Sequence, residues 1–396
     1  MYICNFDRQI ISMFFRDIPG KKEEKSLLIQ QVKLGQIPHA QLFLEKEGYG
    51  GLPLVLAYVS FLMCKNRQES DSCGECEACT KSMKWIHPDI HFAYPVVKYK
   101  DQKREDTTSK EFLPLWRSKL SENPYFSLTD WVRSMEGENS APNINVRECN
   151  EIIHKLSLMS FEGSYKVLIM WLPEFLGKEG NRLLKLIEEP PKDTVILLIT
   201  QQAELILPTV ISRCQIIRVH PFDHQEIAEV LSAKYNIAAD KATQIAHMAD
   251  GNMTMSIEIG NQSTSDFSDM LISWLRISYK GDPVELQDFY AGYGKLSKEE
   301  MSGFIEYGLH FFRQFIRWSV SGSKKSNLTR KEEDIIEKMS AVIDISKAEA
   351  ISWLLDRQLE YIYRNANTKI MFLADSLTVG DIMKGKENVT LHSYYK

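Results

Sequence analysis

The chain has 396 residues, of which 44% are hydrophobic and 26% are charged, and its formal net charge at pH 7 is −5. This composition is ordinary for a globular protein of two to three domains. The acidic balance excludes the overall positive charge that an independent nucleic-acid binder usually carries. No run of about 18 apolar residues is present, and the first eight residues lack the layout of a signal peptide, so we expect a cytoplasmic protein without membrane spans.

The first 220 residues alternate between helix-forming and strand-forming segments. Their apolar periodicity predicts helices at residues 22–36, 52–64, 146–158 and 181–189. Short apolar runs predict strands at residues 41–44, 166–171, 194–200 and 215–219. The run TVILLIT at 194–200 suits a strand that is buried on both faces of a parallel sheet. The alternation predicts a three-layer α/β domain over residues 1–220.

Residues 97–142 interrupt this alternation. They mix lysine, arginine and acidic side chains with glycine, serine, asparagine and proline. We interpret them as an insertion that carries one or two short helices, with a polar loop from Glu136 to Pro142.

From about Pro221 the pattern becomes helical. It breaks at Gly251-Asn252 and again in the polar stretch from Asn261 to Ser268. We therefore predict a small helical domain at residues 221–262 and a larger helical domain at 263–396. The stretch from Phe304 to Trp318 is rich in Phe and Ile, and its helical spacing favours a core or a subunit interface over an exposed binding stripe.

Four of the seven cysteines form a cluster, which comprises Cys64, Cys73, Cys76 and Cys79. Four thiolates complete a tetrahedral shell around Zn²⁺, and a full shell leaves no open position for a catalytic water. We therefore predict a structural zinc module at residues 64–79. Free thiols, or a redox pair at Cys76 and Cys79, are the alternative. The isolated cysteines are predicted to be packed thiols, and they are Cys4, Cys149 and Cys214.

The strand at 41–44 precedes a glycine-containing loop and a helix, which is the layout of a phosphate-binding unit. A working loop reads G-x-x-x-x-G-K-[ST], where the lysine reaches the phosphates and the hydroxyl binds Mg²⁺. Here Glu45 replaces the first glycine, Gly51 the lysine and Leu52 the hydroxyl residue, while Gly48 and Gly50 remain. The loop has lost a positive charge and a metal ligand and has gained a carboxylate. We expect neither a nucleotide cofactor nor ATP hydrolysis.

The acidic residues that would hold Mg²⁺ are also missing from the end of the predicted strand at 166–171. Trp171, Leu172 and Pro173 stand there, and an acidic residue, Glu174, follows only after them. Because Pro173 precedes Glu174 and Phe175 follows it, we interpret Glu174 as part of a surface turn without a catalytic role.

Further segments carry recognisable patterns, and they are Ile37 to Phe43 before the loop, the cysteine module, His87-Pro88-Asp89, NRLLKLIEEPP at 181–191, Ser212-Arg213-Cys214, and Arg364 to Lys369. Their order and spacing resemble the clamp-loader branch of the AAA+ family over most of residues 20–220. The resemblance implies an AAA+ α/β domain with a zinc module, then a small lid-like helical domain and a C-terminal helical collar domain. With four thiolates in place, His87 is expected to pack or cap rather than to bind metal.

That family combines active ATPase subunits, of the gamma and tau type, with an inactive type, delta-prime. The degenerate loop beside a retained Ser-Arg-Cys motif favours the inactive type. So does Thr254, which stands where active members carry a sensor arginine. The resemblance implies that Arg213 reaches the nucleotide of a neighbouring subunit, with Ser212 and Cys214 positioning it. A solvated or salt-bridged arginine is the alternative interpretation.

The resemblance implies a non-catalytic subunit of the pentameric clamp loader of DNA polymerase III, which loads a sliding clamp on primed DNA. Its implied partners are the gamma/tau and delta subunits and, through them, the clamp and primer-template DNA. Two other hypotheses stay open. One is an active AAA+ ATPase with an unorthodox site that uses Glu174, and the other is a zinc-stabilised scaffold unrelated to DNA.

Overall fold

The computed structural model describes residues 13–100, 102–136, 141–261, 267–296, 298–321, 330–363 and 367–386. These residues form two compact units. The first holds the residues up to Val230 together with Ala249–Met255, and the second holds Leu231–Met248 and the residues from Ser256 onward. The predicted division into three domains, with boundaries at 220 and 262, stays a prediction.

Some predicted features lie outside the described residues. Cys4 lies outside them, and so do the first three residues of the segment from Arg364 to Lys369. Two further features lie partly outside the described residues, namely the predicted polar loop from Glu136 to Pro142 and the polar stretch from Asn261 to Ser268.

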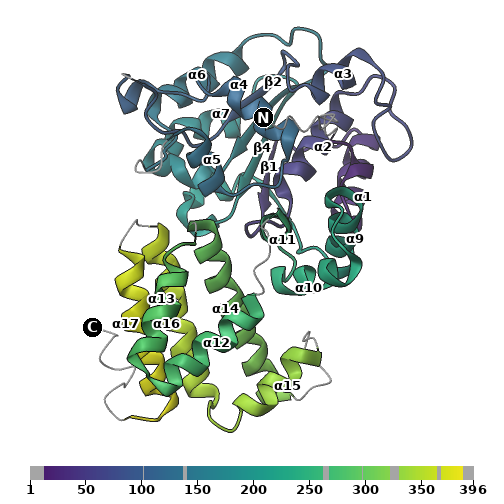
Figure 1. Cartoon of the computed structure of the whole chain (residues 1–396). Coiled ribbons are helices and arrows are strands. Elements are labelled where there is room, and N and C mark those ends of the chain that lie inside the picture. Colours follow the sequence, from purple (N-terminus) through teal and green to yellow (C-terminus); the bar gives the residue numbers. More distant parts are fainter. Residues whose placement is uncertain are drawn as a thin grey trace, which may run out of the picture. The chain divides into compact units, whose positions relative to one another are not determined.

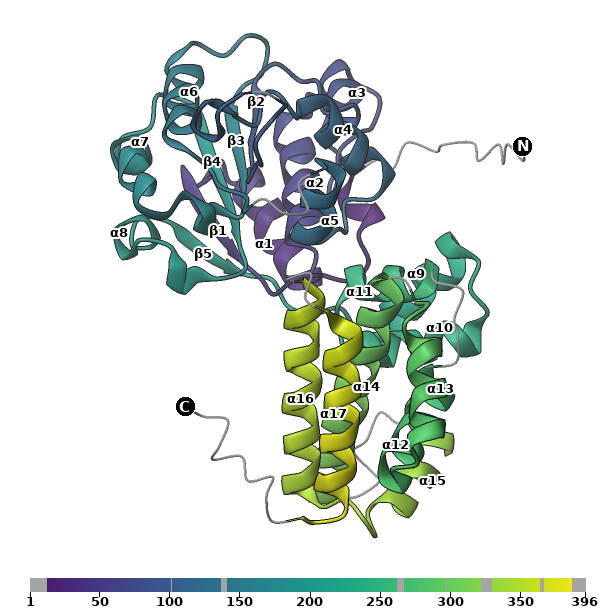
Figure 2. The ribbon, with the colours of Figure 1, turned by 60° about the vertical axis from the view of Figure 1, so that its left-hand side comes forward.

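A five-stranded parallel sheet forms the centre of the described part of the first unit (Figures 1 and 2). Its strands are β1 (Ala40–Leu44), β2 (Ile90–Ala93), β3 (Lys166–Trp171), β4 (Thr194–Thr200) and β5 (Gln215–Arg218). Their order is β2-β3-β4-β1-β5, and each neighbouring pair is parallel. Every residue of β3 and β4 is buried, because helices cover both faces of the sheet. The predicted α/β class is confirmed.

Helices surround this sheet. They are α1 (Lys22–Lys33), α2 (Gly51–Met63), α3 (Glu77–Met83), α4 (Leu113–Glu122), α5 (Leu128–Ser134), α6 (Val146–Ser157), α7 (Leu184–Glu188) and α8 (Pro208–Ile211). Short 3-10 segments are η1 (Phe15–Asp17), η2 (Arg104–Asp106), η3 (Pro173–Leu183) and η4 (Ala203–Leu205). Helix α2, buried at all 13 positions, lies on one side of the sheet, while α6 and α7 lie on the other (Figure 2).

The helix predicted at 181–189 differs from the structure at its start. The α-helical part begins only at Leu184, because the preceding residues form η3, which is broken at Gly177 with a φ of 52°. The helix ends at Glu188, as expected before Pro190 and Pro191.

The insertion at 97–142 carries α4 and α5, as predicted, and it adds aromatic side chains to the core. Trp116 and Trp131 are fully buried. The Trp116 ring stacks on Tyr94 with a centroid distance of 4.1 Å and lies 5.5 Å from Trp171 at the end of β3. Trp131 donates a hydrogen bond of 2.8 Å from Nε1 to the carbonyl of Pro95. The insertion is therefore an integral part of the first unit.

Three helices contain the points at which the chain passes between the two units, and they are α9 (His224–Tyr235), α10 (Ala239–Ala249) and α11 (Met253–Asn261). The rest of the second unit is a helical bundle. It consists of α12 (Phe267–Lys280), α13 (Pro283–Tyr293), α14 (Lys298–Ser321), α15 (Arg330–Met339), α16 (Ile345–Tyr363) and α17 (Thr368–Met383).

The aromatic stretch from Phe304 to Trp318 lies in α14 and supplies the core of this bundle. Phe304, Phe312 and Phe315 are fully buried and belong to one apolar cluster. The prediction of a core stretch is confirmed.

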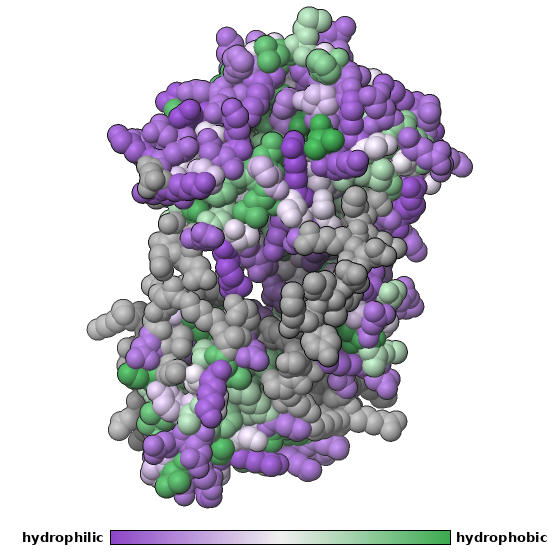
Figure 3. All heavy atoms as spheres, turned by 45° about the horizontal axis from the view of Figure 1, so that its top comes forward, coloured by the Kyte–Doolittle hydropathy of each residue, from purple (hydrophilic) through white to green (hydrophobic). Residues whose placement is uncertain are grey.

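Among the described residues, every helix is too short or too polar to span a membrane. Hydrophilic residues cover most of the coloured surface in Figure 3, with small apolar patches between them.

Candidate functional site

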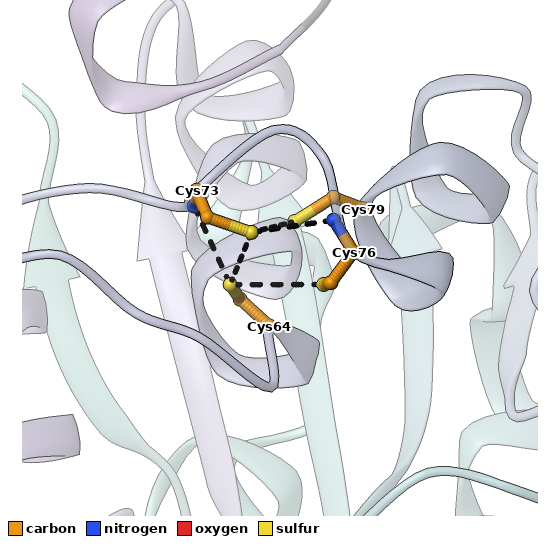
Figure 4. A group of neighbouring side chains, drawn as sticks. All are labelled: Cys64, Cys73, Cys76 and Cys79. Carbon is orange, nitrogen blue, oxygen red and sulfur yellow. Dashed lines mark hydrogen bonds between the residues drawn. The ribbon is translucent and has the colours of Figure 1, made fainter.

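Four thiols converge at the C-terminal end of α2 (Figure 4). Cys64 directly follows α2, Cys73 and Cys76 lie in the next loop, and Cys79 belongs to α3. The Sγ atom of Cys73 lies 3.5 Å from that of Cys64 and 3.8 Å from that of Cys79, and the Sγ atoms of Cys64 and Cys76 are 3.9 Å apart. Thiolates at about 2.3 Å from a tetrahedral Zn²⁺ lie about 3.8 Å from one another. The cluster therefore has the geometry to hold a metal ion.

The cysteine loop is held from several sides. Backbone N–H groups of Cys73 and Cys76 donate hydrogen bonds of 3.4 Å to the sulfurs of Cys64 and Cys73. The Asp71 carboxylate accepts hydrogen bonds from the backbone of Phe15 at 3.1 Å and of Arg16 at 3.0 Å. These bonds fix the loop against η1, so a metal ion at the cluster would be coordinated by an ordered set of ligands.

His87 lies outside the cluster, as expected. It is buried, and its Nδ1 accepts a hydrogen bond of 3.2 Å from the backbone of Asp89. The Asp89 carboxylate in turn accepts hydrogen bonds from the backbone of Phe161, Glu162 and Gly163, at 2.6, 2.9 and 2.7 Å. Burial lowers the pKa of His87, and its ring caps the backbone N–H of Asp89.

The glycine loop at the other end of α2 is occupied by a side chain of the protein itself. Gly50 precedes α2 with a φ of +84°, and Gly51 is its first residue. The Gly51 N–H donates a hydrogen bond of 2.6 Å to Oε2 of Glu45. In a working loop such an N–H group would face a phosphate. Burial raises the pKa of Glu45 to about 8. Leu52 is buried in the first turn of α2 and offers no metal ligand.

Two aromatic rings close the space beside Gly50. A Cβ atom on Gly50 would lie 2.7 Å from the Phe222 ring and 3.4 Å from the Tyr125 ring. The two ring centroids are 6.0 Å apart, and the ammonium of Lys21 lies 3.8 Å from the Phe222 centroid. Tyr125 belongs to the insertion, so this segment helps to fill the loop.

The segment around residue 252 also packs on the glycine loop. The carbonyl of Gly48 accepts a hydrogen bond of 2.9 Å from the backbone of Met253, and a Cβ atom on Gly48 would collide with the side chain of Asn252. Thr254, where a sensor arginine would stand, is 4% exposed. Glycine at position 48 permits this close approach.

The prediction of a surface turn at Glu174 is wrong. Glu174 is only 8% exposed, and its carboxylate accepts hydrogen bonds from the Thr200 hydroxyl at 2.9 Å and the Gln201 backbone at 3.0 Å. Leu172 adopts a left-handed conformation with a φ of 57°, and the chain turns there so that Glu174 reaches the end of β4. Burial raises the pKa of Glu174. The carboxyl group ties the ends of β3 and β4 together.

The Ser212-Arg213-Cys214 segment directly follows α8. The Arg213 side chain is 37% exposed. Its Nη1 donates a hydrogen bond of 2.7 Å to the carbonyl of Thr209 and one of 3.3 Å to the hydroxyl of Ser212. Its Nε forms an ion pair of 2.5 Å with Glu188, the last residue of α7. Cys214 is half-buried, and burial raises its pKa to about 11.

Comparison with known proteins adds the family. A family model described as DNA polymerase III, delta subunit, matches residues 20–223, which is more than half of the chain. The chain belongs to the DNA polymerase III delta-prime subunit family. It is 24% identical over 233 residues to the delta-prime subunit of Bacillus subtilis, covering 59% of this chain and 57% of that one. It is 23% identical over 237 residues to the delta-prime subunit of Escherichia coli, covering 59% and 58%.

These delta-prime matches span about half the length of the curated relatives. Two solved structures are also similar, a gamma subunit-related protein of Thermotoga maritima and a clamp loader delta protein of Bacillus subtilis. The first has a TM-score of 0.39 at 13% identity and the second a TM-score of 0.33 at 10% identity. Each covers 91% of this chain and 99% of the other, and neither adds to the family assignment.

The predicted site residues of this chain thus fall into three separate places. The four cysteines come together, the glycines of the loop are packed against other side chains, and Arg213 lies at the surface beside Glu188. Sequence reasoning missed Tyr125 and Phe222, because only the folded chain brings them to Gly50. It also missed Glu188 as the partner of Arg213, although Glu188 stands in the recognised segment at 181–191.

Proposed function

We propose that the chain is a non-catalytic subunit of a DNA polymerase III clamp loader and that Arg213 completes the ATP site of a neighbouring subunit. The single observation that carries the proposal is a contrast. The loop that would bind the chain's own nucleotide is filled, while the arginine of the Ser-Arg-Cys motif is exposed.

The filled loop supports the absence of ATP hydrolysis by the chain alone. Lysine and hydroxyl are missing at Gly51 and Leu52, and the N–H of Gly51 is bound to Glu45. A Mg-nucleotide would have to displace this carboxyl group and the ring of Phe222 without the lysine that contacts the phosphates in a working loop.

Arg213 supplies a guanidinium group to the nucleotide of the neighbouring subunit. A guanidinium group close to a transferring phosphoryl group neutralises the charge on its oxygens, which contributes about 10³–10⁵ in rate. Lysine would be a poorer substitute, because its ammonium group lacks the planar arrangement of N–H donors that a guanidinium group offers. Ser212 accepts a hydrogen bond from Arg213 and helps to orient it.

The rest of the chain supports assembly in this proposal. The four-cysteine module holds a structural Zn²⁺ and closes the C-terminal end of α2. The helical region from about 263 joins a collar with the gamma/tau and delta subunits in a cytoplasmic hetero-pentamer, and residues 221–262 form the lid-like domain. Sliding clamp and primer-template DNA are then contacted through the complex.

The test is ATPase activity of the loader reconstituted with its gamma/tau and delta subunits, clamp and primed DNA. We expect Arg213→Ala to remove the turnover of one ATP site while assembly, checked by gel filtration, is unchanged. Arg182→Ala is a matched control, because Arg182 is another exposed arginine in an ion pair, with Glu179 at 2.8 Å. Unchanged turnover of the assembled Arg213→Ala loader would contradict the finger role. ATP hydrolysis by the isolated chain that is lost in Glu174→Ala would instead establish the active ATPase.

A further inference from the structure

We propose that Glu188 is a positioning residue for Arg213, an inference that rests on the proposed function. The Oε1 atom of Glu188 lies 2.5 Å from Nε of Arg213, and the carbonyl of Thr209 accepts a hydrogen bond of 2.7 Å from Nη1. Two of the three guanidinium nitrogens are thereby held. Within the described chain, Nη2 makes no hydrogen bond, and it is the edge of the guanidinium left for an anion.

The chain builds this arrangement from the ends of two short helices. Helix α7 ends at Glu188 because Pro190 and Pro191 follow, so the carboxylate is carried by a rigid last turn. Thr209 lies in α8, a helix of four residues whose carbonyls have few partners within the helix. Arg213 binds both, and the backbone N–H of Arg213 donates a hydrogen bond of 3.1 Å to the carbonyl of Val210.

The ion pair does little for folding. The side chains of Arg213 and Glu188 are 37% and 43% exposed, and exposed ion pairs contribute little to stability. Its effect is on the conformational freedom of a long side chain. An arginine that is already held in one rotamer loses less entropy when it engages a phosphate, and this advantage is worth about 2- to 10-fold in rate.

The neighbouring residue provides a matched control. Glu189 is also exposed and directly follows Glu188, but its carboxylate makes no hydrogen bond or ion pair to the residues that the structure describes. Glu188→Ala and Glu189→Ala therefore remove the same charge one residue apart. Only the first removes the contact with Arg213.

The experiment is a double-mutant cycle in the reconstituted loader with clamp, primed DNA and ATP. Its readout is the turnover that depends on Arg213, which is the kcat of the unmodified loader minus the kcat of the Arg213→Ala loader. We expect Glu188→Ala to lower this difference by about 2- to 10-fold. KM for ATP and loader assembly should stay constant, and Glu189→Ala should have no effect. Glu188→Gln should retain part of the activity, because it keeps an oxygen at the position of Oε1 and loses only the charge of the ion pair.

The cycle separates this inference from the proposed function. In the Arg213→Ala background, Glu188→Ala should cause no further loss, and an equal loss there would assign Glu188 a merely structural role and overturn the inference. If Arg213→Ala lowers turnover but Glu188→Ala leaves it unchanged or raises it, the finger stands and the positioning role of Glu188 is wrong. If Arg213→Ala itself has no effect, the proposed function fails first.

Discussion

The two ends of α2 both have the layout of a ligand site, and they differ in whether the residues that would bind the ligand are present. At the C-terminal end, Cys64 and three further cysteines place their sulfurs within 4.8 Å of one another, with the spacing that a metal ion requires. At the N-terminal end, the loop before Gly51 has lost the lysine and the hydroxyl of a nucleotide site. Its backbone N–H is bound to the chain's own Glu45.

This comparison indicates that a loop that has lost its ligand-binding residues is filled by other side chains of the protein. The N–H group of Gly51 is buried, and a buried N–H group without an acceptor is unfavourable. Glu45 supplies the acceptor, and the rings of Tyr125 and Phe222 fill the space beside Gly50. At the cysteine end, the sulfurs contact one another and backbone N–H groups, and no lysine or arginine side chain of the described residues donates a hydrogen bond to them.

Removal of metal should have the largest effect, because it acts on the end of α2 that depends on a ligand. We expect one Zn²⁺ per chain and a large fall in melting temperature after chelation, since structural zinc contributes about 10–16 kcal/mol to the folding of small zinc modules. Metal analysis and thermal unfolding measure both. Cys73→Ser should lose zinc, and Cys214→Ser, at a cysteine outside the cluster, should keep it. If the purified chain contains no zinc and its melting temperature does not change with a chelator, the C-terminal end of α2 does not depend on a metal ion. The proposed difference between the two ends of α2 would then be wrong.

Truncation of a ring beside the glycine loop should have the next largest effect. Phe222 is 3% exposed, so Phe222→Ala should destabilise the first unit by about 3–5 kcal/mol. Tryptophan fluorescence, to which Trp116, Trp131 and Trp171 of this unit contribute, follows unfolding by urea. Phe161→Ala is the control, because Phe161 is 82% exposed and its loss should change stability by only about 0.5 kcal/mol.

The same variant tests the contribution of the ring to nucleotide binding. We expect neither the unmodified chain nor Phe222→Ala to bind Mg-ATP in a calorimetric titration, because the lysine and the hydroxyl are missing from both. Binding by Phe222→Ala alone would mean that the filled space, rather than the lost ligands, keeps nucleotide out of the loop.

The sequence predicted the parts of this molecule that depend on local pattern. The strand limits at 166–171 and 194–200 are those of β3 and β4, because both are continuous apolar runs. Strand β2 was missed, since its four residues, Ile90–Ala93, form an edge strand too short to show a period. Helix α3 was missed for a similar reason, with only seven residues.

In the candidate site, too, the features set by residues close together in the sequence were predictable, and those set by distant residues were not. The cysteine cluster was predictable because its ligands lie within sixteen residues of one another and have a fixed spacing. The filling of the glycine loop was not, because Phe222 and Tyr125 are far from Gly50 in the chain. The error at Glu174 also arose from a distant contact, since its partner Thr200 lies 26 residues further on.

The last of these effects is a dependence of stability on pH that comes from Glu45. Its pKa is raised from 4.5 to about 8 by burial, so between these values the folded chain holds a proton that the unfolded chain releases. Stability must then fall as pH rises from about 4.5 to 8 and stay constant above, with a total change of up to about 5 kcal/mol at about 1.4 kcal/mol per pKa unit. Glu45→Gln keeps a neutral acceptor for the Gly51 N–H at every pH. Its free energy of unfolding should therefore lack the decrease with pH that the Glu45 carboxyl group causes.

The measurement is the difference in unfolding free energy between the unmodified chain and Glu45→Gln, by urea unfolding at several pH values. Other buried carboxyl groups cancel in this difference, and Glu23→Gln, at an exposed glutamate on α1, should give a constant difference instead. If the Glu45→Gln difference is also constant from pH 4.5 to 8, the carboxyl group titrates as it would in water. Glu45 would then not be the buried acceptor that replaces a phosphate at the start of α2, and the two ends of the helix would differ only in their ligands.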